Sequence, residues 1–404
     1  MPRLFTIALL ALSCASVRAA DVVSRDELPL DVRVHHAPTW IAARDGRHAL
    51  YELHIVNYGA RALMLETIEV RDGYSKALRR TLAGRDLIEN LLRPGLDVLD
   101  GQKTQLEAGQ SAVLFLHATA PSEGPAPESL AHRIIVRGPP DSAAAAQTPF
   151  QALDVQAEPV GAGPLVLGRV LRGAGWVAAD GLGDRSDHRR ALITLQGRAT
   201  IAQRHAIDFV RIGPNGRLTR DGSEEGVEAW FGYGAEVLAA ADGVVMSIEN
   251  DIPDNRPLSG VMAARMALDT IAGNYVLLDV GGAYLLYGHL QPGSLQVEVG
   301  EQVRRGQTLA RVGNSGRSDG PHLHVHVVDR PAPFAGEGVA FVFDRFAVNG
   351  RIDDLDAFIA NQEHFLPDAR QQLERATPLL GEVVDFGGQA RGDGERASLR
   401  SLRR

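Results

Sequence analysis

Short apolar runs separated by turn residues make up most of this chain of 404 residues. Among the first 160 residues they include "HRIIVRG" and "YELHIVNYG", in which Tyr51, Leu53 and Ile55 stand at alternate positions. A period of two places one row of side chains on the buried face of a strand. Several such strands with turns between them predict a mostly β protein. For residues 21–159 they predict a β-sandwich of the immunoglobulin-like kind.

A second β-rich domain is predicted downstream of a glycine- and proline-rich segment. The chain has room for about two domains at roughly 150 residues each, and "EPVGAGP" at residues 158–164 is typical of a linker. Beyond it, glycine turns separate further runs such as "NYVLLDVGGAYLLYGHL" and "PHLHVHVV". We predict a second domain over residues 165–346. A helical and disordered C-terminal tail should follow over residues 347–404, with the helix at 353–365 and disorder in the last segment, 387–404.

The N-terminus has the pattern of an export signal. Arg3 precedes an apolar stretch, and Val17 and Ala19 stand where a signal peptidase would cut. We predict that residues 1–19 are a signal peptide and that the protein is exported to the periplasm or the cell exterior. A lipid anchor on Cys14 is the second alternative, because "ALSC" has alanine where the lipoprotein pattern usually has leucine.

Charge and hydropathy exclude several classes of partner. The formal net charge is -8, so no basic field attracts nucleic acid. No run reaches the roughly 20 apolar residues of a membrane-spanning helix. The only cysteine, Cys14, lies in the predicted signal, so the mature chain would form no disulfide. We predict no nucleic-acid partner and no transmembrane segment, and the sequence leaves the oligomeric state open.

The segment "GPHLHVHVVD" carries three histidines at alternating positions of an apolar run. His322, His324 and His326 should therefore line one face of a strand. Alone, this pattern is weak evidence of a site, because alternating histidines can simply be exposed. It gains weight from "RHAIDF", which places His205 and Asp208 on another expected strand.

A longer segment, "YLLYGHLQPGSLQVEVGEQVRRGQTLARVGNSG", contains His289 and is followed closely by "PHLH". In order, glycine turns and spacing, these segments together resemble the lysostaphin-type (LytM-like) zinc metallopeptidases over residues 198–329. A lipoyl or biotinyl carrier hairpin has a similar turn but needs a lysine, and the chain has only Lys76 and Lys103. The resemblance implies the β fold called the duplicated hybrid motif, a Zn²⁺ cofactor and hydrolysis of peptide cross-links in peptidoglycan.

The resemblance also implies roles for individual residues. Asp208 and His324 match two metal ligands, while His289 and His322 match the pair of catalytic imidazoles beside the metal. Imidazole and carboxylate groups suit zinc, and a catalytic zinc site keeps a position open for water. The implied reaction is hydrolysis by zinc-activated water, with the imidazole pair moving its proton and stabilising the oxyanion. His326 shares the face one step further along, and we expect a structural or supporting role for it.

The family's first metal ligand is missing from its usual place. That ligand is a histidine four residues before the aspartate, where this chain has Arg204 before Asp208. His205 is three residues before it, and an odd separation puts two side chains on opposite faces unless a β-bulge intervenes. If "HRRALITLQGRATIAQRHAIDF" is a hairpin whose paired residue numbers sum to about 396, His188 lies opposite Asp208. We rank His188 first as the missing ligand, His205 second and an incomplete metal site third.

Two functions are compatible with these residues. The first is an exported zinc metalloendopeptidase that acts on peptidoglycan or another peptide substrate. The second is a degenerate, non-catalytic module that binds cell wall or regulates another wall hydrolase, which Arg204 at the usual ligand position would favour. The combination of Asp208, His289, His322 and His324 favours the enzyme, because a dead site has no need to keep all four.

Overall fold

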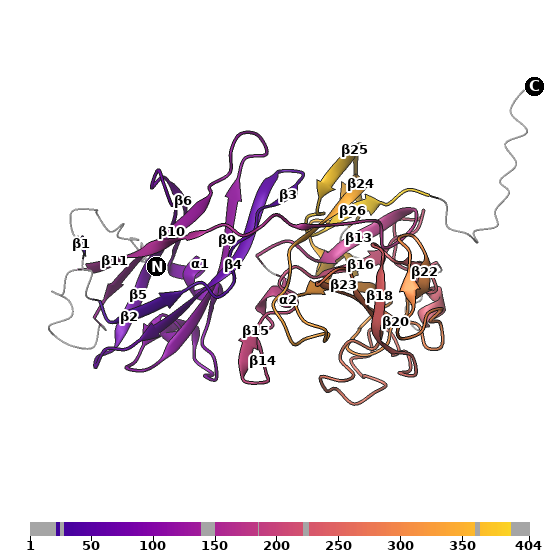
Figure 1. The fold of residues 1–404 in the computed structure, drawn as a ribbon, viewed down its shortest axis with the longest axis horizontal. Helices are drawn as coiled ribbons and strands as arrows, with labels where there is room; N and C mark the ends of the chain where they lie inside the picture. Colours follow the sequence, from indigo (N-terminus) through magenta and orange to yellow (C-terminus); the bar gives the residue numbers. More distant parts are fainter. Residues whose placement is uncertain are drawn as a thin grey trace, which may run out of the picture. The chain divides into compact units, whose positions relative to one another are not determined.

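The computed structural model describes residues 28–138, 150–184, 186–220, 226–359 and 364–388, and the backbone alone of 22–24. These residues form a mostly β protein, as predicted, with several sheets and only short helices (Figure 1). The predicted signal peptide, Cys14 and the part of the predicted tail beyond residue 388 lie outside the described residues.

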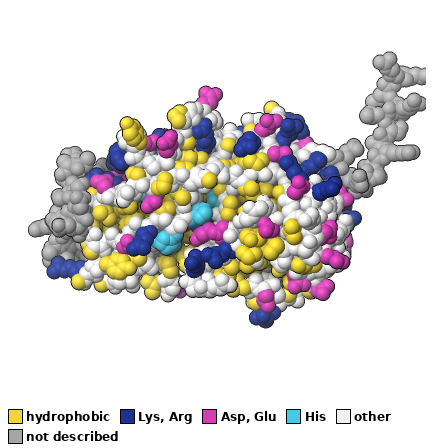
Figure 2. Space-filling model, in the orientation of Figure 1, with side chains coloured by type: hydrophobic (Ala, Val, Ile, Leu, Met, Phe, Trp, Pro, Cys, Tyr) yellow, Lys and Arg dark blue, Asp and Glu magenta, His cyan; other side chains and the backbone are white. Residues whose placement is uncertain are grey.

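Charged and apolar side chains are mixed on one face of the molecule (Figure 2). On the face drawn in Figure 2, basic and acidic groups are interspersed among apolar ones. Across the part of the chain that the structure describes, no helix is both long enough and apolar enough to cross a membrane.

The N-terminal part of the chain contributes two sheets. One has the order β1-β11-β10-β5-β6 with β8 beside β5, and the other has the order β2-β4-β9-β7 with β3 beside β4. Tyr51, Leu53 and Ile55 on β4 are fully buried, as their alternation predicts. The immunoglobulin-like arrangement of these sheets stays a prediction. The elements are β1 (Val22–Ser24), β2 (Leu30–Arg33), β3 (Ile41–Ala43), β4 (Gly46–Asn57), β5 (Leu63–Asp72), β6 (Leu78–Ala83), α1 (Gly84–Glu89), β7 (Leu91–Leu92), β8 (Gln105–Leu106), β9 (Ser111–Ala120), β10 (Ser129–Arg137) and β11 (Phe150–Pro159).

A buried histidine on β10 makes the folded state sensitive to acid. Burial lowers the pKa of His132 to about 4, whereas an unfolded chain binds this proton near pH 6.5. The free energy of unfolding should therefore fall, by on the order of 3 kcal/mol, as the pH drops from about 6.5 to about 4. Urea unfolding across this range should show a smaller loss for His132→Leu than for the wild type. Equal losses in the two proteins would contradict the assignment.

The chain divides into two compact units that interleave along the sequence. The first comprises Met1–His35, Glu52–Leu114 and Glu128–Glu158, and the second comprises His36–Tyr51, Phe115–Pro127 and Pro159–Arg404. The predicted division into 21–159 and 165–346 differs from this, because two early segments belong to the second unit. One reason is packing: Ile41 is buried in an apolar cluster with Ala340 and Val342.

The second unit is built on an 11-stranded sheet with the order β12-β24-β26-β13-β16-β23-β20-β19-β18-β21 and β25 beside β24. Two short pairs, β14-β15 and β17-β22, lie outside this sheet. The elements are β12 (Leu165–Leu167), β13 (Ala174–Asp180), α2 (Asp187–Arg190), β14 (Ile193–Leu195), β15 (Arg198–Thr200), β16 (Ile207–Arg211), β17 (Glu236–Leu238), β18 (Gly243–Glu249), β19 (Asn274–Asp279), β20 (Tyr284–Leu290), β21 (Gln302–Val303), β22 (Thr308–Arg311), β23 (Leu323–Val328), β24 (Phe341–Arg351), α3 (Leu355–Ile359), β25 (Leu366–Ala376) and β26 (Glu382–Asp385).

The large sheet continues past residue 346, where the sequence predicted the second domain to end. β24 crosses that residue, and β25 and β26 both pair with β24 (Figure 1). The prediction of a helical and disordered tail over 347–404 is therefore wrong for these strands. The helix α3 lies within the range predicted at 353–365, of which residues 360–363 lie outside the described residues. The strand β25 is almost wholly exposed and polar, so backbone pairing holds it in place and no apolar alternation reveals it.

The central strands of this sheet have one apolar and one polar face. Ile207 and Phe209 on β16 and Val325 on β23 are buried in the main apolar cluster of the second unit. Because side chains alternate along a strand, Asp208 and His324 point to the opposite face. That opposite face carries the candidate site.

Candidate metal and catalytic site

Neighbouring strands place two predicted ligands side by side. The register of β16 and β23 puts Asp208 directly opposite His324, and the register of β13 and β16 puts Asp180 opposite Asp208. Nδ1 of His324 lies 2.8 Å from Oδ1 of Asp208. The structure therefore brings together the two residues that the family pattern matched to metal ligands.

His188 reaches the same place from a short helix. The predicted hairpin register is wrong, because the β14-β15 ladder ends at Ile193 opposite Thr200 and β16 pairs with β13 and β23 instead. His188 lies on α2, with its Nε2 3.5 Å from Oδ2 of Asp208. Its Nδ1 lies 3.4 Å from Oδ2 of Asp180. His188 is thus beside Asp208, although not across a hairpin as predicted.

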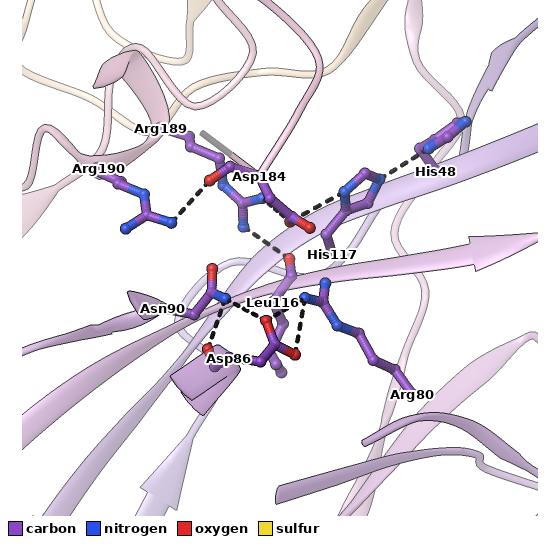
Figure 3. A network of polar contacts seen from close by, with 9 residues as sticks. All are labelled: His48, Arg80, Asp86, Asn90, Leu116, His117, Asp184, Arg189 and Arg190. Atoms are coloured by element: carbon purple, nitrogen blue, oxygen red, sulfur yellow. Dashed lines mark hydrogen bonds and ion pairs between the residues drawn. The ribbon is translucent and has the colours of Figure 1, made fainter. Parts of the chain in front are cut away.

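Two arginines fix the helix that carries His188. Arg189 is fully buried, and its Nη2 donates a 2.8 Å hydrogen bond to the carbonyl of Leu116 (Figure 3). Arg190 donates a 2.8 Å bond to the carbonyl of Asp184, whose carboxylate lies 3.4 Å from Nη1 of Arg189 (Figure 3). A helix of one turn is not stable by itself. The distant contact with Leu116 and the local contacts with Asp184 therefore position the imidazole of His188.

One atom each of His188, Asp208 and His324 could hold a metal ion. The three atoms lie within 4.8 Å of one another, and we call these residues the ligand group. Two imidazole nitrogens and one carboxylate oxygen form a donor set that suits a catalytic zinc ion with three protein ligands. The residues present therefore fit the zinc site that the resemblance implies.

The charge state of the ligand group also suits a metal. Burial alone would raise the pKa of Asp208, but the surrounding imidazoles, with His188 first, lower it below the usual range of a carboxyl. Burial lowers the pKa of His324, and the attraction of Asp208 opposes this. At neutral pH the group offers a carboxylate and a neutral imidazole, which are the forms that bind metals.

The residues at the family's usual first-ligand position have other contacts. Arg204 is buried, its Nη2 lies 2.7 Å from Oε2 of Glu337, and its Nη1 donates to the carbonyl of Gly338. His205 is also buried, and burial followed by the charge of Arg204 lowers its pKa well below the usual value. Among the described residues, the ligand group includes His188 and leaves out His205.

His289 and His322 present proton-accepting nitrogens beside the ligand group. Nδ1 of His322 lies 2.8 Å from the carbonyl of Gly320, and Nδ1 of His289 lies 2.8 Å from the carbonyl of Ser315. A carbonyl only accepts, so Nδ1 carries the proton in each neutral ring and Nε2 keeps its lone pair. Nε2 of His322 is 3.5 Å from Oδ2 of Asp208. The two ring centroids are 4.6 Å apart.

A β-bulge turns His289 toward this face. The register between β19 and β20 shifts so that Gly288 and His289 lie opposite a single residue of β19. His289 adopts a φ of 56°, which is uncommon for a residue with a side chain. In a regular strand it would share the core-facing side of Tyr287. The bulge instead brings its ring centroid to 5.7 Å from that of His324.

The ligand group and both histidines line one pocket of about 400 Å³. That volume is in the range of pockets that take small ligands or a short peptide segment. Aromatic and apolar walls come from Trp230, Phe334 and α3, and acidic groups from Asp187, Asp319 and Asp356. Sequence reasoning missed Asp180, which also lines this pocket, because it stands at a strand end outside every recognised motif.

Part of the chain is similar to known peptidases. Residues 222–335 match the model of peptidase family M23. Among the relatives, the peptidoglycan DD-endopeptidase ShyA of Vibrio cholerae serotype O1 is 34% identical over 101 residues, which are 25% of this chain and 19% of that protein. Endolysin 2638A of Staphylococcus phage 2638A is 34% identical over 83 residues, covering 20% and 17% of the two chains. This chain thus spans about a fifth of the length of these relatives.

Among the solved structures that match the chain is a mutant form of the catalytic domain of the prophage-encoded M23 protein EnpA from Enterococcus faecalis. It is 19% identical, covers 41% of this chain and 88% of its own, and has a TM-score of 0.23. The matched residues 222–335 contain His289, His322 and His324 and begin after His188 and Asp208. The family match over residues 222–335 and its named relatives support a peptidase M23 domain of the lysostaphin type in this chain, as the sequence motifs predicted.

Proposed function

We propose that the protein is an exported zinc metalloendopeptidase that hydrolyses peptide cross-links of peptidoglycan. The observation that carries this proposal is the ligand group in one pocket with His289 and His322. Peptidoglycan as substrate is supported by relatives named peptidoglycan DD-endopeptidase. Export to the periplasm or the cell exterior is supported by the pattern of residues 1–19.

His188, Asp208 and His324 would hold the zinc ion. Nδ1 of His324 lies 2.8 Å and Nε2 of His188 lies 3.5 Å from the carboxylate of Asp208. When bound, zinc supplies Lewis acidity, which polarises a peptide carbonyl and lowers the pKa of water. Asp180, which faces Nδ1 of His188, would fix the orientation of that ring, as partners of metal-bound histidines commonly do.

His289 and His322 would move the proton of the attacking water. Because carbonyl groups hold their Nδ1–H groups, each offers a free Nε2 lone pair as acceptor. The ring that takes the proton becomes a cationic donor to the developing oxyanion. It then passes the proton to the leaving amine as the carbon–nitrogen bond breaks. The hydroxyl of the water is thereby added to the new carboxyl end of the peptide, and its proton to the new amino end.

The alternative of a non-catalytic module has less support. The reason to consider it was that Arg204 stands at the usual ligand position. An ion pair between Arg204 and Asp208 would indicate a degenerate site. Arg204 instead forms an ion pair with Glu337. Asp208 has the imidazoles of His188, His322 and His324 around it.

Zinc content and wall digestion, measured on one preparation, test the proposal. We expect about one zinc per chain by elemental analysis, a stoichiometry that follows from a single set of three protein ligands. Purified sacculi should release soluble fragments with new amino groups, a chelator should stop the release, and added zinc should restore it. Asp208→Asn is the matched control and should lose both the bound zinc and the release of fragments. A protein that binds no zinc and releases no fragments would reject the enzyme in favour of a binding module.

A further inference from the structure

The third histidine of the strand has no part in the reaction above, although it is fully buried beside it. We propose that His326 is a positioning residue for the ligand group. It holds His324 in the tautomer whose Nδ1 is free to bind a metal. This inference rests on the proposed function, because it concerns the same site.

A continuous row of hydrogen bonds links His326 to the ligand group. Nε2 of His326 lies 2.7 Å from the carbonyl oxygen of Pro333. Nδ1 of His326 lies 2.7 Å from Nε2 of His324. On the far side of that ring, Nδ1 of His324 lies 2.8 Å from Oδ1 of Asp208. Each nitrogen of the two rings therefore has one partner within this row.

The carbonyl of Pro333 determines which nitrogen donates and which accepts in each hydrogen bond of this row. The carbonyl of Pro333 can only accept, so Nε2 of His326 carries the proton and its neutral Nδ1 must accept. Nε2 of His324 is then the donor, which leaves the lone pair of that ring on Nδ1. A lone pair and a carboxylate oxygen that face each other at 2.8 Å repel unless a cation lies between them. The row thus prepares His324 and Asp208 for a shared cation.

The acceptor at the end of the row is held in place by its own loop. Asp329 accepts a 2.9 Å hydrogen bond from the backbone N–H of Glu337, which closes the loop that contains Pro333. Glu337 also pairs with Arg204. The residue that replaced the family's first ligand thereby helps to fix the loop that orients another ligand.

A purely structural histidine would be a poor choice at this position. On β20, the residue opposite His326 is Leu286, which is fully buried. The ring of Phe334 packs at a centroid distance of 5.8 Å from that of His326. In apolar surroundings a polar ring costs free energy unless both nitrogens are hydrogen-bonded, whereas an aliphatic side chain would cost none. Both nitrogens of His326 are hydrogen-bonded, which a positioning role requires.

Two substitutions of His326 separate positioning from packing. His326→Leu fills the space but removes the acceptor, so His324 can adopt the opposite tautomer. His326→Gln keeps an acceptor for His324 and a donor for the carbonyl of Pro333. Competition with a chromophoric chelator should show zinc binding of the full chain weakened about 10–100-fold by leucine and nearly unchanged by glutamine. His205→Leu, which removes another buried histidine, is the matched control and should bind zinc like the wild type.

Nitrogen NMR of histidine-labelled, metal-free protein gives a readout that does not depend on zinc. We expect His326 of the wild type to carry its proton on Nε2. Observation of the Nδ1–H form would overturn the proposal. So would leucine and glutamine variants of His326 that bind zinc equally well or equally poorly. A wild type that binds no zinc would instead reject the proposed function. The tautomer of His326 would then still show whether the hydrogen bonds of the row have the inferred donors and acceptors.

Discussion

Replacing His188 by alanine should strip the protein of zinc, whereas His205→Ala should leave the metal bound. His188 places Nε2 3.5 Å from the carboxylate of Asp208, and His205 lies outside the ligand group. Loss of a direct ligand should weaken zinc binding by more than the roughly 10–100-fold that follows loss of an outer partner. Elemental analysis of the two variants beside the wild type makes the measurement, and release of wall fragments should follow the zinc content.

The two histidine variants control for each other, because both remove a partly or fully buried imidazole from the same part of the chain. A loss of zinc from His205→Ala alone would identify that residue as the ligand, acting through a bulge. Full zinc content in both variants would show that the ligand scheme is wrong.

Alanine at His322 or at His289 should abolish most of the turnover without removing zinc. A positioned proton-transfer group contributes about 10²–10⁴-fold to the rate, and each of these rings offers its free Nε2 to the pocket. We expect kcat on purified wall fragments to fall by that factor, while zinc content stays at the wild-type level. His205→Ala serves again as the control for loss of a buried imidazole. A variant with unchanged kcat, or one that loses its zinc, would contradict the assigned role.

Local patterns predicted one face of the site well. Asp208 stands between Ile207 and Phe209, and His324 stands between Leu323 and Val325, so alternation alone sends both polar side chains away from the core. The family motifs then indicated that these two residues belong together, and the register of β16 and β23 places them opposite each other.

Other features depend on contacts that no local pattern contains. The bulge at His289 reverses the parity of its strand, so alternation would assign that ring to the core side. His188 was chosen on a hairpin register that the chain does not adopt, and it arrives through a helix held by Arg189. The strand β25 exists because β24 offers it a free edge, not because its own residues alternate.

The hydrogen bond from Arg189 to the carbonyl of Leu116 limits how the proposed peptidase could be moved to another protein. A cassette cut to the family match at 222–335 would omit His188 and Asp208. A longer cassette from residue 165 would retain both, yet it would remove the carbonyl of Leu116 on β9, one of the acceptors of the fully buried Arg189 guanidinium. Loss of a hydrogen bond made by a charged group costs about 1.5–3 kcal/mol. A portable version of the proposed peptidase should therefore include β9, which lies far upstream of the family motifs.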